Sequence, residues 1–335
     1  MTRTSRLTLA ALCCSAAAFA SIGGTVVNRT SGKPQAGVPV TLVKPGANGM
    51  QTLGSTSTDA NGHFAFDKDQ PGGGPQLLQA AYKGVTYNKL MTPNIPTSNV
   101  ELPIYEATAS PAVARIVERM LIIQPSTGQI SVGENVMIQN PSNTTYNDPV
   151  QGGLRFYLPP AANGQVRVNA QGPQGMPLPR AAERTNETDV YKVNFPIKPG
   201  ETEFEVSYVL PAGTPFTFRG RNVGVKGMPA GPLRIVVPSG VTLAGKDVQN
   251  VGTEPKTLAT IYNVTAPDAF TADITGIGSL RASDDSAASG DNSDSPPLTE
   301  GPPQIYRHQA WLILLGLSIL GVGLVVLFRN SPVRD

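Results

Sequence analysis

Cysteine and charge are both scarce in this sequence of 335 residues. The only two cysteines, Cys13 and Cys14, are adjacent and lie in an apolar run near the N-terminus. The rest of the chain can therefore form no disulfide and no thiolate metal site. Charged residues make up 15% of the chain, against about 25% in an average protein. The net charge of +2 is spread without a basic stripe, so DNA and RNA are not expected as partners.

Histidine is equally rare, which limits the chemistry available. His63 follows a turn and has no glutamate three positions later, so it belongs to no zinc-binding HExxH motif, and His308 is the only other histidine. The nucleophile motif GxSxG and the phosphate-binding motif GxxxxGK[ST] are also absent. Glu201, Glu203 and Glu205 alternate along one expected strand and should face solvent rather than form a catalytic pair. The sequence predicts no enzyme, no cofactor and no metal.

Side chains with oxygen atoms near His63 are the one group that could form a metal site, namely a weak calcium site. Asp59 and Asn61, followed by Asp67 and Asp69, supply the type of ligand that calcium prefers. The glycine and the later glutamate of an EF-hand loop are out of register with them. A simple turn is therefore favoured over a weak calcium site.

Glycine and proline, in contrast, are abundant. They contribute 35 and 31 residues, together about a fifth of the chain against about 12% on average. Such frequent turn residues are typical of β-sandwiches and barrels and exclude an all-α fold. The sequence predicts an all-β fold built of tandem sandwiches.

Alternating apolar and polar residues support this prediction in residues 109–275. The alternation is clear over residues 154–158, 191–195 and 203–210, as expected for antiparallel strands with one buried and one solvated face. The region is long for one immunoglobulin-like (Ig-like) sandwich of about 100 residues. It is either an elaborated Ig-like sandwich or a sandwich with a small β-subdomain after about residue 214.

A second set of strands is expected in residues 21–108. Residues 38–43 and 64–66 alternate, and the turn cluster Asp59-Ala60-Asn61-Gly62 precedes the second run, so we expect a hairpin joined at this turn. The region contains the strings GTVVNRTSGKPQAGVPVTLV and STDANGHFAF. These strings resemble the carboxypeptidase regulatory-like domain, a transthyretin-like β-sandwich. The resemblance implies a seven-stranded Greek-key module that serves as a structural or accessory domain in exported bacterial proteins, and it implies no peptidase.

The N-terminus predicts export. Arg3 and Arg6 precede an apolar run that ends in Ala18-Phe19-Ala20, which is the pattern of a signal peptide. We expect residues 1–20 to be removed by cleavage before Ser21.

The C-terminus predicts a membrane anchor. Residues 311–328 form a run of 18 residues without charge, which as a helix is long enough to cross a bilayer. Arg329 and Arg334 follow it and suit a short cytoplasmic tail, residues 329–335. Before the span, glycine, serine, proline and aspartate make up 18 of the 29 residues 276–304, so this segment is expected to be a disordered linker.

These features predict a single-pass membrane protein with an exported N-terminal region. We expect a non-catalytic interaction or structural protein that presents its sandwiches to a protein of the cell envelope. A carbohydrate-binding module, and an accessory factor for the assembly or maturation of a membrane complex, are the alternatives. Sugar platforms are built from exposed aromatic rings, and the single tryptophan, Trp311, lies in the expected span. The tyrosines that would have to replace it are Tyr82, Tyr87, Tyr105, Tyr146 and Tyr157.

Overall fold

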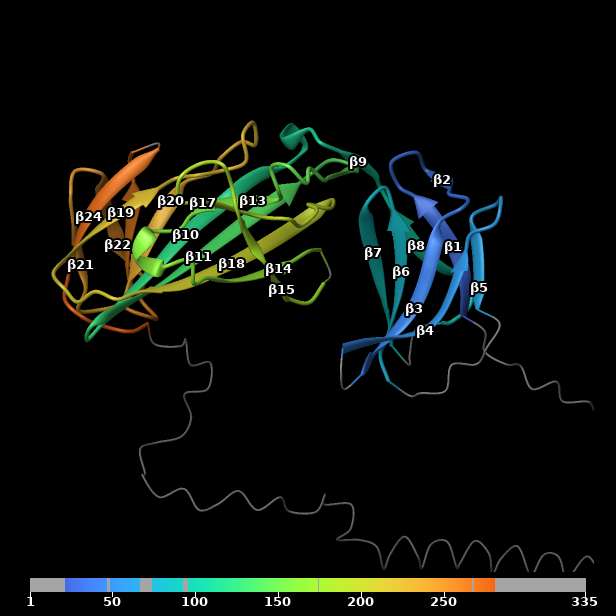
Figure 1. The fold of residues 1–335 in the computed structure, drawn as a ribbon, viewed down its shortest axis with the longest axis horizontal. Coiled ribbons are helices and arrows are strands. Elements are labelled where there is room, and N and C mark those ends of the chain that lie inside the picture. Colours follow the sequence, from blue (N-terminus) through green and yellow to red (C-terminus); the bar gives the residue numbers. More distant parts are fainter. Residues whose placement is uncertain are drawn as a thin grey trace, which may run out of the picture. The chain divides into compact units, whose positions relative to one another are not determined.

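The computed structural model describes most of the chain between residues 22 and 280, namely residues 22–46, 49–66, 74–92, 96–173, 175–266 and 268–280. Their regular structure consists of β-strands and two short 3₁₀ turns, η1 (Pro111–Val113) and η2 (Pro160–Ala162) (Figure 1). The chain is therefore all-β over these residues, as its composition predicted. No helix among them is both long and apolar enough to cross a bilayer.

Several expected segments lie outside the described residues. They are the signal peptide (1–20), the membrane span (311–328), the tail (329–335) and all but the first five residues of the linker (276–304).

The first part of the chain folds as two four-stranded sheets with a shared core. One sheet has the order β4-β3-β6-β7; in the other, β1 pairs with β2, β5 and β8. Side chains from both sheets meet in a core that includes Val26, Leu42, Leu78 and Leu102, all fully buried. The strands are β1 (Ile22–Asn28), β2 (Lys33–Pro34), β3 (Pro39–Gly46), β4 (Gly49–Ser57), β5 (His63–Phe66), β6 (Gln76–Tyr82), β7 (Val85–Met91), β8 (Val100–Ile104) and β9 (Glu106–Thr108).

The prediction of a hairpin joined at the turn of residues 59–62 is wrong. The turn is present, but β3 pairs with β4, while β5 joins the other sheet and pairs with β1. β4 was hard to read from the sequence, because residues 49–57 are mostly glycine, serine, threonine and glutamine and none of them is buried. With β4 overlooked, the nearest apolar run looked like the partner of β3.

One glycine permits the close approach of β8 to β1. β8 runs parallel to β1, and a Cβ atom at Gly24 would lie 1.8 Å from the carbonyl oxygen of Val100. Real Cβ atoms do not approach backbone oxygens so closely, so any side chain at this position would push the strands apart.

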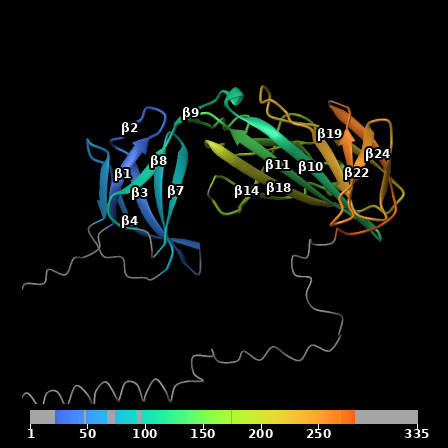
Figure 2. The ribbon, with the colours of Figure 1, turned by 180° about the vertical axis from the view of Figure 1, so that it is seen from behind.

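The second part of the chain is a larger sandwich built on an eight-stranded sheet of order β15-β14-β18-β11-β10-β20-β23-β22 (Figures 1 and 2). Two three-stranded sheets, β13-β17-β16 and β19-β24-β21, supply the rest of its core. The strands are β10 (Arg115–Ser126), β11 (Gln129–Asn140), β12 (Thr144–Tyr146), β13 (Leu154–Tyr157), β14 (Arg167–Gln171), β15 (Leu178–Arg180), β16 (Ala182–Arg184), β17 (Val190–Val193), β18 (Gly200–Leu210), β19 (Phe216–Arg221), β20 (Leu233–Val237), β21 (Thr242–Ala244), β22 (Val248–Thr253), β23 (Thr260–Val264) and β24 (Ala269–Thr275).

The alternation read from the sequence matches these strands. In β18, Phe204, Val206 and Tyr208 are buried while Glu203 and Glu205 are exposed. β13 and β17 form an antiparallel pair, and β18 pairs antiparallel with β11 and β14, as expected.

The residues after position 214 belong to the same body as those before it. β20, β22 and β23 extend the eight-stranded sheet that also holds β10, β11 and β18. Buried side chains of β19, β21 and β24 belong to one continuous core with those of β10 to β18. Among the described residues, those after position 214 thus share a sheet and a core with those before it.

Specific contacts join the two sandwiches. β9, at the end of the first, pairs in parallel with β12 of the second. The hydroxyl of Tyr87 lies 2.9 Å from that of Thr145, and the Lys198 ammonium donates a hydrogen bond of 2.6 Å to the carbonyl of Thr86. The junction is therefore held by backbone and side-chain hydrogen bonds together.

Candidate functional site

His63 and its neighbours form a turn. The His63 ring nitrogen Nδ1 lies 2.9 Å from the Thr25 hydroxyl. The Asp59 carboxylate accepts hydrogen bonds of 2.8 Å from the backbone N–H groups of Asn61 and His63, and the bond from His63 is the main reason that the pKa of Asp59 is lowered. Among the described residues, no three His, Cys, Asp or Glu side chains gather as they would around a metal ion.

The remaining candidate residues are Asp67, Asp69, His308 and three glutamates of β18. Asp67, Asp69 and His308 lie outside the described residues. The glutamates at positions 201, 203 and 205 are all exposed on β18, as expected for a solvated face.

The five tyrosines named above are mostly engaged within the fold. Tyr87 and Tyr146 are buried, at 3% and 0% exposure. The guanidinium of Arg221 lies over the ring of Tyr157, 5.7 Å from its centroid. Tyr105 stacks obliquely with Tyr87, at 5.9 Å between centroids, and the hydroxyl of Tyr82 belongs to the network described next.

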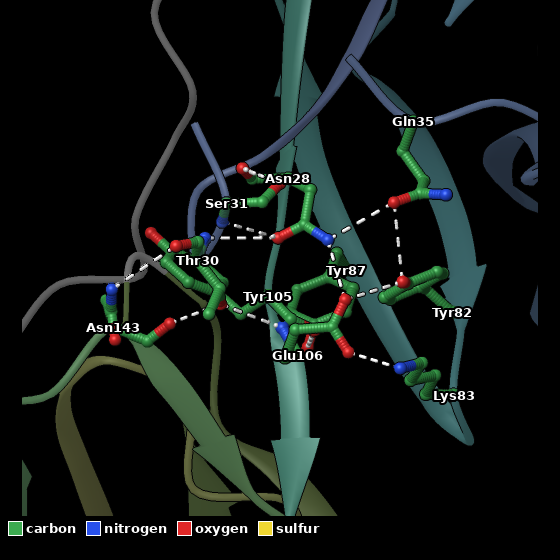
Figure 3. A network of polar contacts seen from close by, with 10 residues as sticks. All are labelled: Asn28, Thr30, Ser31, Gln35, Tyr82, Lys83, Tyr87, Tyr105, Glu106 and Asn143. Atoms are coloured by element: carbon green, nitrogen blue, oxygen red, sulfur yellow. Dashed lines mark hydrogen bonds and ion pairs between the residues drawn. The ribbon is translucent and has the colours of Figure 1, made fainter. Parts of the chain in front are cut away.

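A network of polar side chains surrounds Glu106 where the chain leaves the first sandwich (Figure 3). The Glu106 carboxylate accepts hydrogen bonds from Tyr82 at 2.7 Å, from Asn28 at 2.8 Å and from Lys83. The Lys83 contact, followed by that of Tyr82, lowers the pKa of Glu106 to about 2. Gln35 accepts a further bond from Asn28 at 3.2 Å. Since the members satisfy one another, this network fixes the start of β9 and offers no open site.

An open site does exist on the three-stranded sheet β13-β17-β16. A groove of about 520 Å³ is lined by side chains of these strands and by the neighbouring segments 149–150 and 185–187. This volume falls in the usual range of ligand sites, about 300–1,000 Å³. We call it the cationic groove, because Arg155, Arg184 and Lys192 line it against a single acid, Glu187.

Two of these cations are unusually well covered. Arg155 on β13 and Lys192 on β17 are directly opposite in the antiparallel register. Their side chains are only 12% and 16% exposed, whereas the acids paired with them, Glu187 and Glu183, are 59% and 50% exposed. Like charges directly opposite on neighbouring strands are destabilising. The cations thus lie toward the floor of the groove, and the acids that balance them lie toward solvent.

The three cations of the groove interact with carboxylates, with a backbone carbonyl and with an aromatic ring. Arg155 donates to the Glu187 carboxylate at 2.7 Å. Lys192 donates to the carbonyl of Pro149 at 2.6 Å and lies 3.5 Å from Glu183. The guanidinium of Arg184 lies over the ring of the buried Tyr191, 5.6 Å from its centroid. Among the described residues, Arg184 has no carboxylate within ion-pair distance.

The wall of the groove opposite β16 is a firmly held turn. The Asp148 carboxylate accepts a hydrogen bond of 2.8 Å from the Val150 N–H. The backbone carbonyl of Asp148 accepts another, also of 2.8 Å, from the Gly152 N–H. A Cβ atom at Gly153 would lie 2.1 Å from the carbonyl oxygen of Phe195, so the end of the turn is pressed against the segment after β17. The turn presents Val150, which is 81% exposed, beside the cations.

The sequence reasoning did not find this groove. The alternation over residues 154–158 and 191–195 did place Arg155 and Lys192 on an outward face. Their direct opposition depends on the register of β13 with β17, which alternation alone does not supply. A valine in a turn otherwise made of Asp, Pro, Gln and Gly was the remaining signal.

A second pair of charges lies inside the same sandwich and has a different character. Arg119 on β10 and Glu134 on β11 form an ion pair, and their side chains are only 3% and 4% exposed. The Arg119 guanidinium also donates to the carbonyls of Val223 and, at 3.4 Å, of Arg155. It thereby links the eight-stranded sheet to β13, which makes it part of the fold rather than a binding group.

Comparison with known proteins adds little to these findings. No family model and no curated protein matches the sequence. Similar solved structures include the M1 zinc metallopeptidase from Deinococcus radiodurans, at 14% identity and a TM-score of 0.28, and a mutant of it bound to a Tyr-Ser-Ala substrate, at 14% identity and 0.27. Each match covers 49% of this chain and 42% of the peptidase, so the chain spans less than half of that enzyme. A likeness this distant assigns neither family nor activity.

Proposed function

We propose that this chain is a membrane-anchored, non-catalytic protein that binds a protein partner of the cell envelope through its second sandwich. The observation that carries the proposal is the cationic groove, which combines covered cations with an exposed valine on a rigid turn. Such a combination of fixed charge and apolar surface is suited to recognition of another protein.

The finer fold assignment is part of this proposal. We take residues 21–108 as transthyretin-like and residues 109–275 as Ig-like. Two sheets surround one core in the first region and three sheets surround one core in the second, with antiparallel pairing for most strands, and both observations support this assignment. The fold by itself does not decide the function, so the groove and not the sandwich architecture carries the proposal.

The location is proposed from the sequence. A signal peptide at residues 1–20 and a span at residues 311–328 would place the sandwiches on the exported side and residues 329–335 in the cytoplasm. A carbohydrate ligand is less well supported than a protein, because Tyr87 and Tyr146 are buried and provide no exposed ring for a sugar to stack on.

Crosslinking in intact cells tests the proposed function. The full-length chain is compared with a chain whose residues 311–328 are replaced by an unrelated span, and with the variant Val150→Arg. Val150 is 81% exposed, so the variant should fold normally while the longer side chain obstructs the groove. Val251→Arg, at a position 58% exposed on β22, is the matched control.

We expect the same partner to be recovered with the replaced span and with Val251→Arg, and to be lost with Val150→Arg. Recovery that depends on the sequence of the span but not on Val150 would show that the sandwich does not carry the recognition.

A further inference from the structure

The charge balance of the cationic groove shows what kind of group it lacks. Glu187 pairs with Arg155 and Glu183 lies 3.5 Å from Lys192, but among the described residues Arg184 has no carboxylate within ion-pair distance, so the cations exceed the acids by one. Glu187 is 59% exposed while its partner Arg155 is 12% exposed. An exposed glutamate has other rotamers available at little cost, whereas the covered arginine is held by the sheet. The floor is therefore fixed and its internal counter-charge is displaceable.

The position of Glu187 indicates the chemistry of the missing group. Its carboxylate bonds to the Arg155 guanidinium at 2.7 Å, at the mouth of a groove that also contains Lys192 and Arg184. A carboxylate from outside would make the same charge-assisted bond and would also approach the two other cations. Glu187 thus occupies the place that an incoming carboxylate would take.

Other features favour a peptide as the carrier of this carboxylate. Val150 provides apolar surface directly beside the cations, and Asn186 provides an amide group in the lining. A sugar ring packs well on an exposed aromatic face, but the ring of Tyr191 beneath Arg184 is only 7% exposed. Free phosphate would make no use of the apolar wall.

We infer that the cationic groove binds an acidic segment of a protein, with one of its carboxylates between Arg155 and Lys192 in place of Glu187 and an apolar side chain against Val150. This inference rests on the proposed function and adds the chemistry of the partner. In this structure the Glu187 carboxylate is bonded to Arg155, and the partner binds by exchange of one carboxylate for another.

Binding to the full-length chain tests the inference. The probe is a fluorescent peptide of alternating glutamate and valine, followed by anisotropy, and its glutamine and valine counterpart is the control peptide. Oligogalacturonate and inorganic phosphate serve as competitors. We expect the acidic peptide to bind, the neutral peptide not to bind, and high salt to weaken binding through screening.

Three variants separate a binding role from a structural one. Arg155→Gln and Lys192→Gln should each weaken binding about tenfold, because each removes a charge-assisted bond. Arg234→Gln is the matched control, since Arg234 is also an arginine paired with a glutamate, at 3.4 Å, but it lies on β20. It should leave binding unchanged.

Glu187→Gln gives the most distinctive result. Removal of the internal competitor should strengthen peptide binding about threefold, which loss of folding cannot imitate. Because Glu187 is exposed, this variant also remains informative if the two floor variants fold poorly.

The inference is overturned if Glu187→Gln weakens binding, or if Arg234→Gln weakens it as much as Lys192→Gln. Preferential binding of oligogalacturonate would assign the groove to an acidic glycan, and competition by phosphate at equal concentration would reduce it to a general anion site. If Val150→Arg abolishes crosslinking while the acidic peptide does not bind, the proposed function stands and only the ligand class is wrong.

Discussion

Two arginine–glutamate pairs in the second sandwich differ in which partner is covered. In the pair of Arg119 and Glu134 both side chains are buried, at 3% and 4% exposure. In the pair of Arg155 and Glu187 only the arginine is covered, at 12% against 59%. A pair that is buried on both sides is committed to the fold, because separating the charges would leave one of them without compensation. A pair covered on one side leaves a positioned charge that another molecule can reach.

The largest expected effect comes from breaking the buried pair. Glu134→Gln leaves the Arg119 guanidinium buried without a counter-charge, so we expect the free energy of unfolding to fall by about 3–5 kcal/mol. Urea unfolding followed by circular dichroism measures this. Glu187→Gln, at the exposed acid, should change stability by less than about 1 kcal/mol.

The double variant Arg119→Met/Glu134→Leu sharpens the result. Because apolar replacements avoid the uncompensated charge, it should be more stable than Glu134→Gln alone. If Glu134→Gln and Glu187→Gln lowered the free energy of unfolding equally, the buried pair would contribute no more to the fold than the half-covered one.

A smaller effect tests whether the wall of the groove is as fixed as its floor. Gly153→Ala would bring a Cβ atom to 2.1 Å from the Phe195 carbonyl, so the turn that carries Val150 must move. We expect a loss of about 1–3 kcal/mol, as for other overpacked sites, together with weaker binding of the acidic peptide. Gly213→Ala, where no atom lies within 4 Å of the new Cβ, is the control and should change neither quantity.

The smallest effect concerns a pair in which neither partner is buried, with Lys83 at 53% and Glu106 at 30% exposure. Bonds to the Glu106 carboxylate lower its pKa to about 2 from an ordinary 4.5. A lowered pKa in the folded state stabilises the fold above about pH 4.5, and this contribution disappears as the pH falls toward 2. Solvent screening limits it to about 1 kcal/mol.

Glu106→Gln tests this dependence on pH. The variant should be less stable than the parent chain at pH 6, and the difference should shrink in thermal melts as the pH is lowered from 5 to about 2. A difference that stays constant over this range would mean that the carboxylate charge contributes nothing at the junction.

The sequence was most informative where burial alternates along a strand. β18 and β13 could be read directly, because every second residue is apolar. β4 could not, because the residues of an exposed edge strand carry no apolar pattern. The partner of β5 also could not be read, since pairing is decided between segments distant in the chain.

The same limit applied to the candidate site. The outward direction of Arg155 and Lys192 followed from alternation, but their adjacency followed only from the register of two strands more than thirty residues apart. The contrast in exposure between these cations and their acids depends on the turn at residues 148–153, on β16, which carries Glu183, and on the loop after it, which carries Glu187; no local pattern encodes how these segments are placed.

The parallel pairing of β9 with β12 limits how this protein can be rearranged in evolution. A recombination event at residue 108 would carry Glu106–Thr108 into a new chain without Thr144–Tyr146, and the backbone groups that pair them would need new partners. The hydroxyl of Tyr87 would also lose Thr145. The first sandwich is therefore not a freely exchangeable cassette, and the two sandwiches are expected to be inherited together as one unit.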